Sequence, residues 1–368
     1  MLSARKNIMH KPVLAILTDT IRYDNQAALK YFTKIKPVHF YKSAPYGDLR
    51  KEDLKEAISY RDFRDLEEKL IRLKPDIIQG AEPYGSRVQL KLCRIAYRIS
   101  KKLNIPLIFP SLENRPVNSR FGKVSGPVLK HVLKVYAKQA SLIFYLNEGA
   151  KKNLLKAGVS PEKLKSLLYG IWGINTDLFK PNIPLQERGL GQYILFVGRL
   201  DEAKGVPYIL QAWKKIKDEF PKIELVFIGD DKLNVQVKGE RIKKLGILKN
   251  EQLPPYFANA LFTLCPSVTL KRWEEQVGMT NLQSLACGTP VITTKSGAIP
   301  EYINEKVGIL IPEKNANALA EAMKKLLKNS KLRQKLGQNG VTYIKENFEV
   351  KKTIQKTEEI LLGLIKKV

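Results

Sequence analysis

Residues 275–301 read EQVGMTNLQSLACGTPVITTKSGAIPE, and this stretch carries the most information in the chain. Glu275 stands shortly before Gly278 and a helical run over 280–286, and a strand-like apolar run follows over 291–294. A glycine lets the backbone approach a ligand closely, and the free N–H groups at a helix start attract anions. The stretch therefore predicts a diphosphate site in which Glu275 holds the hydroxyls of an attached polar group.

Strand-like and helix-like patterns alternate along nearly the whole chain around this stretch. In the first half, strands are expected over 13–17, 76–78, 107–109 and 142–146, and helices over 61–73, 88–103 and 148–157. In the second half, strands are expected over 193–197, 225–228 and 261–265, and helices over 206–220 and 251–259. This alternation predicts an α/β protein with parallel, doubly wound sheets.

The length of 368 residues exceeds what one ordinary core contains, so two domains are expected. Residues 169–181 are rich in glycine, asparagine and aromatic side chains, and residues 182–192 have the composition of a linker. The predicted domains are therefore 1–180 and 181–349. Two α/β halves that face one linker predict a cleft between them.

The composition is that of a folded protein in a reducing compartment. The apolar runs are of strand length, shorter than the roughly 18 to 20 residues of a membrane span. The first residues lack the features of a signal peptide. Cys93, Cys265 and Cys287 are odd in number and scattered, as expected of buried thiols and not of disulfides or metal ligands. A cytoplasmic location is expected.

The chain carries 64 basic and 36 acidic residues, for a net charge of +28. In residues 84–147 the single acid is Glu113. A lysine-rich solvated surface and attraction to anionic lipid headgroups at a membrane are equally favoured explanations, and nucleic acid is less favoured. Within 126–138, apolar residues (128, 129, 132, 133 and 136) are expected on a core-facing side and lysines on the other, with a helix lying on a membrane as the alternative.

Several segments resemble one enzyme family. They are FVGRLDEAKGV (196–206), ELVFIGDD (224–231), residues 245–267, the opening stretch and residues 307–327. Together they are similar to the donor-nucleotide domain of the retaining glycosyltransferases of family 4, which have the GT-B fold of two Rossmann-like domains facing a central cleft. The first half resembles the family more loosely, over 73–85, 104–114 and 140–164.

The resemblance implies a hexosyltransferase that moves a sugar from a UDP- or GDP-sugar to a glycan or lipid-linked acceptor with retention of configuration. No metal and no cofactor is implied, and cell-surface polysaccharide biosynthesis is the expected context. A peripheral position at the inner face of a membrane is one expectation for such an acceptor. The last helix, over 350–366, is expected to pack back onto the first domain, as it does in the family.

Residue by residue, the resemblance implies a donor site with three catalytic candidates. Arg199 and Lys204, in the turn after Gly198, correspond to residues that contact the diphosphate, where cations stabilise the leaving charge. Glu275 corresponds to the acceptor of hydrogen bonds from the sugar hydroxyls; Glu274 lies one position off the matching spacing. The other implied donor contacts are Gln276, Val277, Gly278, Met279 and Thr280, with Gln283 and Leu248 for the nucleoside.

The sequence departs from the family at three places. Gln283 stands where the family has a second glutamate, which takes the ribose hydroxyls, and an amide offers a single acceptor oxygen. The first loop, 18–22, lacks the family's glycines, and none of His10, His39 and His131 matches the family's histidine. Glu113 is the fourth catalytic candidate, near the acceptor hydroxyl or the reacting sugar, although pairing with Arg115 or a lysine explains it equally well. Glu82 is a weaker candidate at another strand end.

Two other functions stay open at this point. The altered position 283 and the missing glycine loop are consistent with a noncatalytic nucleotide-sugar-binding protein on the same fold. A nucleotide-sugar 2-epimerase, which shares the fold, is less favoured because the motifs resemble those of the transferases.

Overall fold

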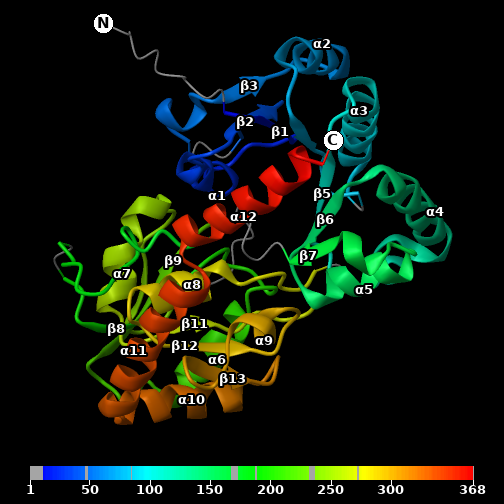
Figure 1. The fold of residues 1–368 in the computed structure, drawn as a ribbon. Coiled ribbons are helices and arrows are strands. Elements are labelled where there is room, and N and C mark those ends of the chain that lie inside the picture. The colour runs from blue at the N-terminus through cyan, green and yellow to red at the C-terminus, as the bar shows by residue number, and fades with distance from the viewer. Residues whose placement is uncertain are drawn as a thin grey trace, which may run out of the picture.

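The computed structural model describes residues 11–45, 49–83, 85–166, 173–186, 189–231, 237–271 and 273–367. Two parallel sheets organise the chain, one formed by residues 13–166 and the other by residues 192–311 (Figure 1). The predicted boundary at 180/181 falls between the last strand of the first sheet and the first strand of the second. We refer to the two parts as the first and the second domain.

The first sheet has seven strands in the order β3-β2-β1-β4-β5-β6-β7. The strands are β1 Val13–Leu17, β2 Lys36–Tyr41, β3 Ala57–Ser59, β4 Ile77–Gln79, β5 Leu107–Ser111, β6 Leu142–Tyr145 and β7 Leu164–Ser166. The helices are α1 Tyr23–Gln26, the 3-10 turn η1 Ala27–Tyr31, η2 Glu52–Leu54, α2 Phe63–Leu73, α3 Arg87–Leu103, α4 Val117–Gln139, α5 Glu148–Lys156 and η3 Pro161–Lys163. All pairs are parallel, so the carboxyl ends of the strands share one edge, where such sheets bind ligands.

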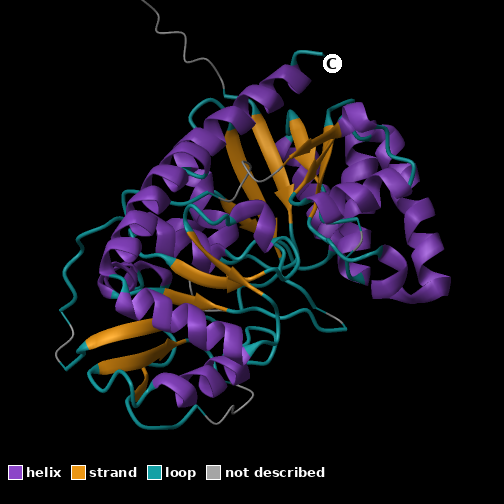
Figure 2. Cartoon of the chain, turned by 90° about the horizontal axis from the view of Figure 1, so that it is seen from below, coloured by secondary structure: helices purple, strands orange, loops and turns teal. Residues whose placement is uncertain are grey.

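The second sheet has six strands in the order β10-β9-β8-β11-β12-β13, and all its pairs are parallel. The strands are β8 Gln192–Val197, β9 Ile223–Ile228, β10 Ile242–Lys244, β11 Thr263–Cys265, β12 Val291–Thr294 and β13 Gly308–Ile311. The helices are α6 Val206–Ile216, η4 Asn250–Gln252, α7 Pro254–Asn259, α8 Met279–Ala286, α9 Ile299–Tyr302, α10 Ala316–Lys328, α11 Ser330–Asn347 and α12 Val350–Ile365. The two groups of strands, with loops between them, can be followed in Figure 2.

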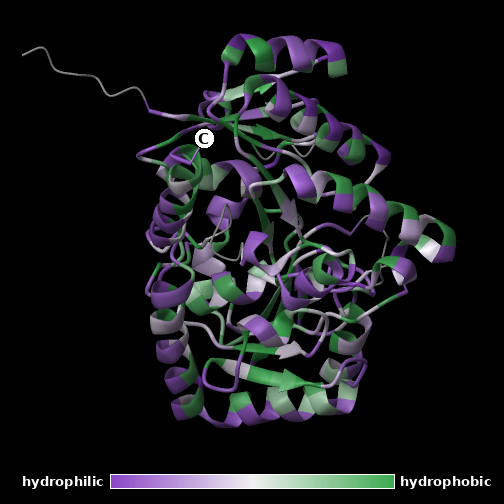
Figure 3. Ribbon diagram, turned by 45° about the vertical axis from the view of Figure 1, so that its right-hand side comes forward, coloured by the Kyte–Doolittle hydropathy of each residue, from purple (hydrophilic) through white to green (hydrophobic). Residues whose placement is uncertain are grey.

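Burial explains why these segments are strands and helices. The side chains of β1, β4, β11 and β12 are buried along their whole length, which requires an apolar run covered on both faces. In Figure 3 the strands are mainly green and the helices alternate between green and purple, as expected of helices that cover a sheet with one face. Local caps fix the helix starts: Asp62 accepts hydrogen bonds from two backbone N–H groups of α2, and Ser86 with Gln89 forms a capping box on α3.

The last helix, α12, returns to the first domain. Its residues Val350, Ile354 and Leu361 are buried together with Leu14 and Leu29 of the first domain. The buried Glu358 carboxylate accepts hydrogen bonds from the backbone N–H groups of residues 33, 34 and 35, at 2.8, 2.5 and 2.8 Å. α12 is drawn in red across the first domain in Figure 1. The chain therefore closes the first domain with its own C-terminal end.

One surface expectation is wrong. Val128 was placed on the core-facing side of the helix over 126–138, but its side chain is 60% exposed. The helix has a non-helical residue at Gly122 (φ 82°, ψ 170°), and the side that faces the core is formed by Gly126, Leu133 and Ala137. The lysine side therefore carries exposed valines as well. Among the described residues, no helix is long and apolar enough to cross a membrane.

Candidate active site

Two cavities lie at the carboxyl ends of the strands, one in each domain. One, of 380 Å³, belongs to the first domain and is lined by the loops after β1, β4 and β5. The other, of 310 Å³, belongs to the second domain and is lined by the ends of β8 and β11 and the start of α8. The side chain of Arg22, just before α1, lines both. A ligand in each cavity would therefore meet the other at Arg22.

The turn after β8 forms one wall of the second-domain cavity. Gly205 has φ 76° at the start of α6, and a Cβ atom there would lie 2.0 Å from the carbonyl oxygen of Pro266. A glycine is therefore required where this turn packs against the loop after β11. The turn is tied internally, because Asp201 accepts a hydrogen bond from the Lys204 N–H at 2.9 Å and pairs with Arg199 at 3.2 Å. The Lys204 side chain is thereby aimed into the cavity.

Lys204 and Glu275 form the charged centre of this cavity. The Lys204 Nζ atom donates a hydrogen bond to Glu275 Oε2 at 2.6 Å, and the Ser267 hydroxyl donates to the same oxygen at 3.0 Å. Burial raises the pKa of the Glu275 carboxyl, but Lys204 and Ser267 outweigh burial and hold that pKa below its ordinary value. Glu275 is therefore a carboxylate that presents an acceptor oxygen in the cavity.

Trp273 lies beside both basic residues of the turn. The Lys204 ammonium is 4.7 Å and the Arg199 guanidinium 5.9 Å from the centre of the indole ring. Both distances are within the range of cation–π attraction. Trp273 is held in a tight turn by two backbone hydrogen bonds with Leu270, at 2.8 and 3.2 Å. The indole therefore lies against Lys204, which lines the cavity, and against Arg199, which does not.

The start of α8 supplies the remaining wall. Gly278 has φ 80°, and among the described residues no side chain caps this helix start. Residues 276–281 line the cavity, so the first N–H groups of α8 face it. Asn281 is 1% exposed, and its Oδ1 atom has no hydrogen-bond partner among the described residues. A buried acceptor of this kind calls for a donor, such as a ligand hydroxyl.

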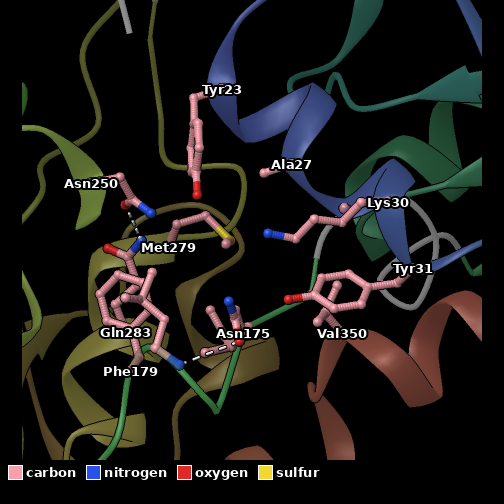
Figure 4. A pocket seen from close by; sticks show the side chains of 14 residues that line it. Tyr23, Ala27, Lys30, Tyr31, Asn175, Phe179, Asn250, Met279, Gln283 and Val350 are labelled. Carbon is pink, nitrogen blue, oxygen red and sulfur yellow. Dashed lines mark hydrogen bonds between the residues drawn. The ribbon is translucent and has the colours of Figure 1, made fainter. Parts of the chain in front are cut away.

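Gln283 lies one turn further along α8, in a third cavity of 120 Å³ shown in Figure 4. Its Nε2 atom donates to Asn250 Oδ1 at 2.9 Å. Met279 lines both this cavity and the one at Glu275, so the two cavities adjoin at the start of α8. The opposite wall comes from the first domain, through Tyr23, Lys30 and Tyr31. An elongated ligand that starts at Glu275 can therefore extend along α8 to the amide pair.

The first-domain cavity is polar and contains two buried titratable groups. Burial lowers the pKa of His39 to about 4, and the His39 Nδ1 atom lies 2.9 Å from Gln26 Oε1. Burial raises the pKa of the Glu82 carboxyl, although its Oε1 atom accepts hydrogen bonds from the backbone N–H groups of Leu112 and Glu113 at 2.6 and 2.7 Å. The other polar side chains of this cavity are Thr18, Asp19, Thr20, Asn25, Gln79, Ser86 and Gln89.

Glu113 does not line any of these cavities in the described structure. Its carboxylate is fully buried and accepts hydrogen bonds from Arg115 Nε and Nη2 at 2.9 and 3.0 Å. Arg120 forms a second ion pair with the other side of the carboxylate. Of the two explanations offered by the sequence, the structure shows the ion pair, because both oxygens are occupied by guanidinium groups.

The sequence-predicted donor residues divide into two groups. Lys204, Glu275 and residues 276–280 line the second-domain cavity, and Gln283 lines the third. Arg199 lies outside the cavity lining, 55% exposed and paired with Asp201; Gly198 and Leu248 also lie outside it. Leu248 packs against the core of the second domain, and Asn250, two residues later, reaches Gln283.

Sequence reasoning missed Arg22, Trp273 and Asn281 as site residues. Asn281 had a sequence signal, because it is a polar residue near the start of the helix that was predicted to bind the diphosphate. Glu274, the alternative hydroxyl acceptor, lies outside the cavity lining, and burial raises the pKa of its carboxyl.

Two asparagines of the first domain donate hydrogen bonds to the backbone of residues 275–301 in the second domain. Asn114 Nδ2 donates to the Glu275 carbonyl oxygen at 2.9 Å, and Asn147 Nδ2 donates to the Gln276 carbonyl oxygen at 3.4 Å. The Tyr302 hydroxyl donates to the Leu146 carbonyl oxygen at 2.6 Å in the opposite sense. The two domains are therefore connected beside the site. In the described part of the chain, no group of three or more His, Cys, Asp or Glu residues has the geometry to hold a metal.

Comparison with known proteins relates the C-terminal half of the chain to one family. Residues 183–342 match the model of the family described as "Glycosyl transferases group 1". The chain is 31% identical over 171 residues to spore coat protein SA of Bacillus subtilis, covering 42% of this chain and 44% of that protein. It is 23% identical over 318 residues to the sulfoquinovosyl transferase SQD2 of Arabidopsis thaliana, covering 80% and 58%. The chain thus spans about half the length of the curated relatives it matches.

Solved structures identify the fold of the whole chain. The Anabaena protein Alr3699/HepE in complex with UDP superposes with a TM-score of 0.77 at 15% identity, covering 96% of this chain and all of that one. A glycosyltransferase from Rickettsia africae superposes with a TM-score of 0.76 at 16% identity, covering 97% of this chain and all of that one. The expected GT-B fold, with two Rossmann-like domains, is confirmed.

Proposed function

We propose that this chain, with its GT-B fold and its second domain related to the group 1 glycosyl transferases, moves a sugar from a nucleotide diphosphosugar to a hydroxyl of a glycan or lipid-linked acceptor. One observation carries the proposal: a polar cavity of the first domain and a charged cavity of the second domain meet at Arg22. The charged cavity suits the donor and the polar one suits a polyhydroxyl acceptor. The UDP and UDP-glucose complexes of the Anabaena neighbour are consistent with a nucleotide-sugar donor.

The donor is proposed to lie along the start of α8. Its diphosphate is held by Lys204, Arg199, Arg22 and the free N–H groups after Gly278, which together offset its negative charge. Glu275 accepts hydrogen bonds from the sugar hydroxyls, and Asn281 Oδ1 supplies a further acceptor. The nucleoside extends toward Gln283 and Asn250, in the cavity of Figure 4.

In the proposed reaction, the bond between the anomeric carbon and the diphosphate oxygen breaks, and a bond from that carbon to the acceptor oxygen forms on the same face. The leaving diphosphate oxygen takes the proton of the acceptor hydroxyl, so no separate base is required. Charge grows on the diphosphate as the sugar leaves, and the cations around it stabilise that state more than the ground state. The inward-facing first-domain carboxyl, Glu82, is hydrogen-bonded to backbone and positions the loop after β5.

The cation cluster also supports a proposal of metal-independent transfer. Lys204, Arg199 and Arg22 supply positive charge where a divalent ion does so in metal-dependent transferases. The expected outcome is that dialysis against EDTA leaves the rate of transfer unchanged. A loss of activity that magnesium or manganese restores would contradict it.

The purified chain incubated with radiolabelled UDP- and GDP-sugars, and with lipid and oligosaccharide extracts as acceptors, tests the proposal. Transfer of label to an acceptor, lost in Arg22→Ala and Lys204→Ala, is expected. The exposed Lys331→Ala on α11 is the matched control and retains transfer. Formation of an epimeric nucleotide sugar without acceptor would overturn the proposal in favour of a 2-epimerase. A putative UDP-N-acetylglucosamine 2-epimerase from Listeria monocytogenes superposes less well, with a TM-score of 0.59.

A second candidate function rests on the Gln283–Asn250 amide pair. Neither side chain is charged, so the hydrogen bonds that this pair can make to a ribose are weaker than those of a carboxylate. A noncatalytic nucleotide-sugar-binding protein on the same fold would bind donor without turning it over. Saturable binding of a donor with no transfer to any acceptor in the extracts would support this candidate against the transferase.

A further inference from the structure

The outer side of α4 combines exposed valines with basic residues. Of the five exposed large apolar side chains in the described part of the chain, three belong to α4: Val124, Val128 and Val135, which are 83%, 60% and 42% exposed. They are spaced by four and seven residues, so they form one stripe along the helix. A soluble surface rarely concentrates such side chains without a partner.

Basic residues border this stripe. Lys123, Lys134 and Lys138 are exposed, Lys130 is half-buried, and α4 contains no acidic residue. Arg120, one turn before the stripe, pairs with the buried Glu113 and so faces inward. The four lysines therefore leave a net positive charge around an apolar strip on a convex helix. We call Lys123, Val124, Val128, Lys130, Lys134, Val135 and Lys138 the α4 face.

The chemistry of the α4 face selects its partner. We propose that the α4 face docks on an anionic lipid bilayer, with the valines entering the interfacial region and the lysines contacting the headgroup phosphates. A bilayer offers an apolar phase directly beneath a layer of negative charge, which matches an apolar strip bordered by ammonium groups. Nucleic acid satisfies the lysines but leaves the valines in water.

The position of α4 fits such docking. α4 lies at the outer edge of the first domain, away from both α12 and the second sheet (Figure 1). The backbone bends at Gly122, which sets the α4 face apart from the first turn of the helix. That first turn follows β5 and the Glu113–Arg115 pair, next to the first-domain cavity that Leu112 lines. A docked α4 face therefore brings the first-domain cavity close to the lipid surface.

Vesicle flotation of the full-length protein tests the docking. The wild type is expected to float with vesicles of phosphatidylcholine mixed with phosphatidylglycerol, and not with phosphatidylcholine alone. The variants V124S/V128S/V135S and K123Q/K130Q/K134Q/K138Q are each expected to bind the mixed vesicles at least about tenfold more weakly. Six of the seven side chains are exposed and Lys130 is half-buried, so the thermal unfolding midpoint is expected to stay close to that of the wild type.

A matched control separates the α4 face from the overall charge. K325Q/K331Q/K335Q/K345Q removes four exposed lysines from α10 and α11 and is expected to bind like the wild type. Three outcomes would overturn the proposal: no flotation of the wild type, an equal loss in this control, or wild-type binding by the valine variant. Wild-type binding by the valine variant would mean that the lysines alone attract the protein to any polyanion, including acidic proteins. Flotation does not require sugar transfer, so the docking and the proposed function can fail separately.

Discussion

Lys204 Nζ lies 2.6 Å from Glu275 Oε2, and the two residues reach the second-domain cavity from the loops after β8 and β11. The pair helps to hold the pKa of the carboxyl below its ordinary value, so Glu275 lines the cavity as an ionised acceptor. In the proposed complex, the diphosphate of the donor therefore contacts a lysine that is already hydrogen-bonded to Glu275. The two charges are consequently coupled in the bound state.

The first prediction concerns this carboxylate. Glu275→Ala is expected to lower kcat/KM by about 100-fold or more, because a buried acceptor aimed at the reacting group contributes on this scale. Glu274→Ala, which removes the adjacent carboxylate outside the cavity lining, is the matched control and is expected to change kcat/KM by less than about tenfold. Steady-state kinetics with the identified donor provides the measurement. Equal losses in the two variants would contradict the assignment.

The second prediction concerns the amide pair. Gln283→Glu replaces a neutral acceptor with a carboxylate next to Asn250, and charged acceptors make stronger hydrogen bonds. Nucleoside diphosphate is expected to bind this variant about fivefold more tightly by calorimetry. The gain should disappear with the 2′,3′-dideoxy nucleotide, which lacks the ribose hydroxyls. A gain that persists with that nucleotide would place the ribose elsewhere.

The third prediction concerns pH. Burial lowers the pKa of His39 to about 4, so the folded protein holds it neutral while the unfolded chain protonates it near pH 6.5. Its contribution to stability is therefore present above pH 6.5 and is lost as the pH falls toward 4. Between pH 7 and pH 5 the free energy of unfolding is expected to drop by about 2 kcal/mol through this group.

Urea unfolding at several pH values measures this effect. His39→Asn keeps a hydrogen-bonding group beside Gln26 and should flatten the pH dependence in this range. His131→Asn, an exposed residue of α4, is the control and should leave the slope as it is. A wild-type slope in His39→Asn would assign the titration to another group.

The fourth prediction concerns Glu358 on α12. Glu358→Ala removes the acceptor of three backbone N–H groups and is expected to lower the free energy of unfolding by about 3 kcal/mol. Glu359→Ala, at the exposed neighbouring position, should change it by less than about 0.5 kcal/mol. Denaturant unfolding of both variants is the measurement. Comparable losses would show that helix propensity, and not the capping of residues 33–35, is responsible.

The long buried segments of the fold were predictable from the sequence, and the short edge strands were not. The strands at 13–17, 107–111 and 291–294 stand out because apolar or β-branched residues dominate each of them. β3, β7 and β10 have three residues each, mostly exposed or half-buried, so their sequences carry no period to recognise. β2 reads KPVHFY and was missed because its lysine, proline and histidine interrupt the apolar run.

The site was predictable where a motif fixed the backbone. The glycine turns at 205 and 278 and the carboxylate at 275 follow from local sequence, because only particular residues fit those conformations. Arg22 lines the second-domain cavity although it belongs to the first domain, and Trp273 contacts Lys204, which is distant in sequence. Such contacts depend on tertiary folding and cannot be predicted from a local sequence pattern. Glu113 shows the reverse: its isolation among basic residues is explained by the two arginines that bury it.

The last helix has a consequence for how the protein is made. A ribosome synthesises a chain from its N-terminal side onward, yet β1 and η1 pack against residues 350–365, which are translated after the strands of both sheets. The six strands of the second sheet lie within 192–311, so that sheet can close while the first domain still exposes apolar side chains to solvent. The first domain, although it is translated first, can therefore be completed only after residues 350–365 have been synthesised.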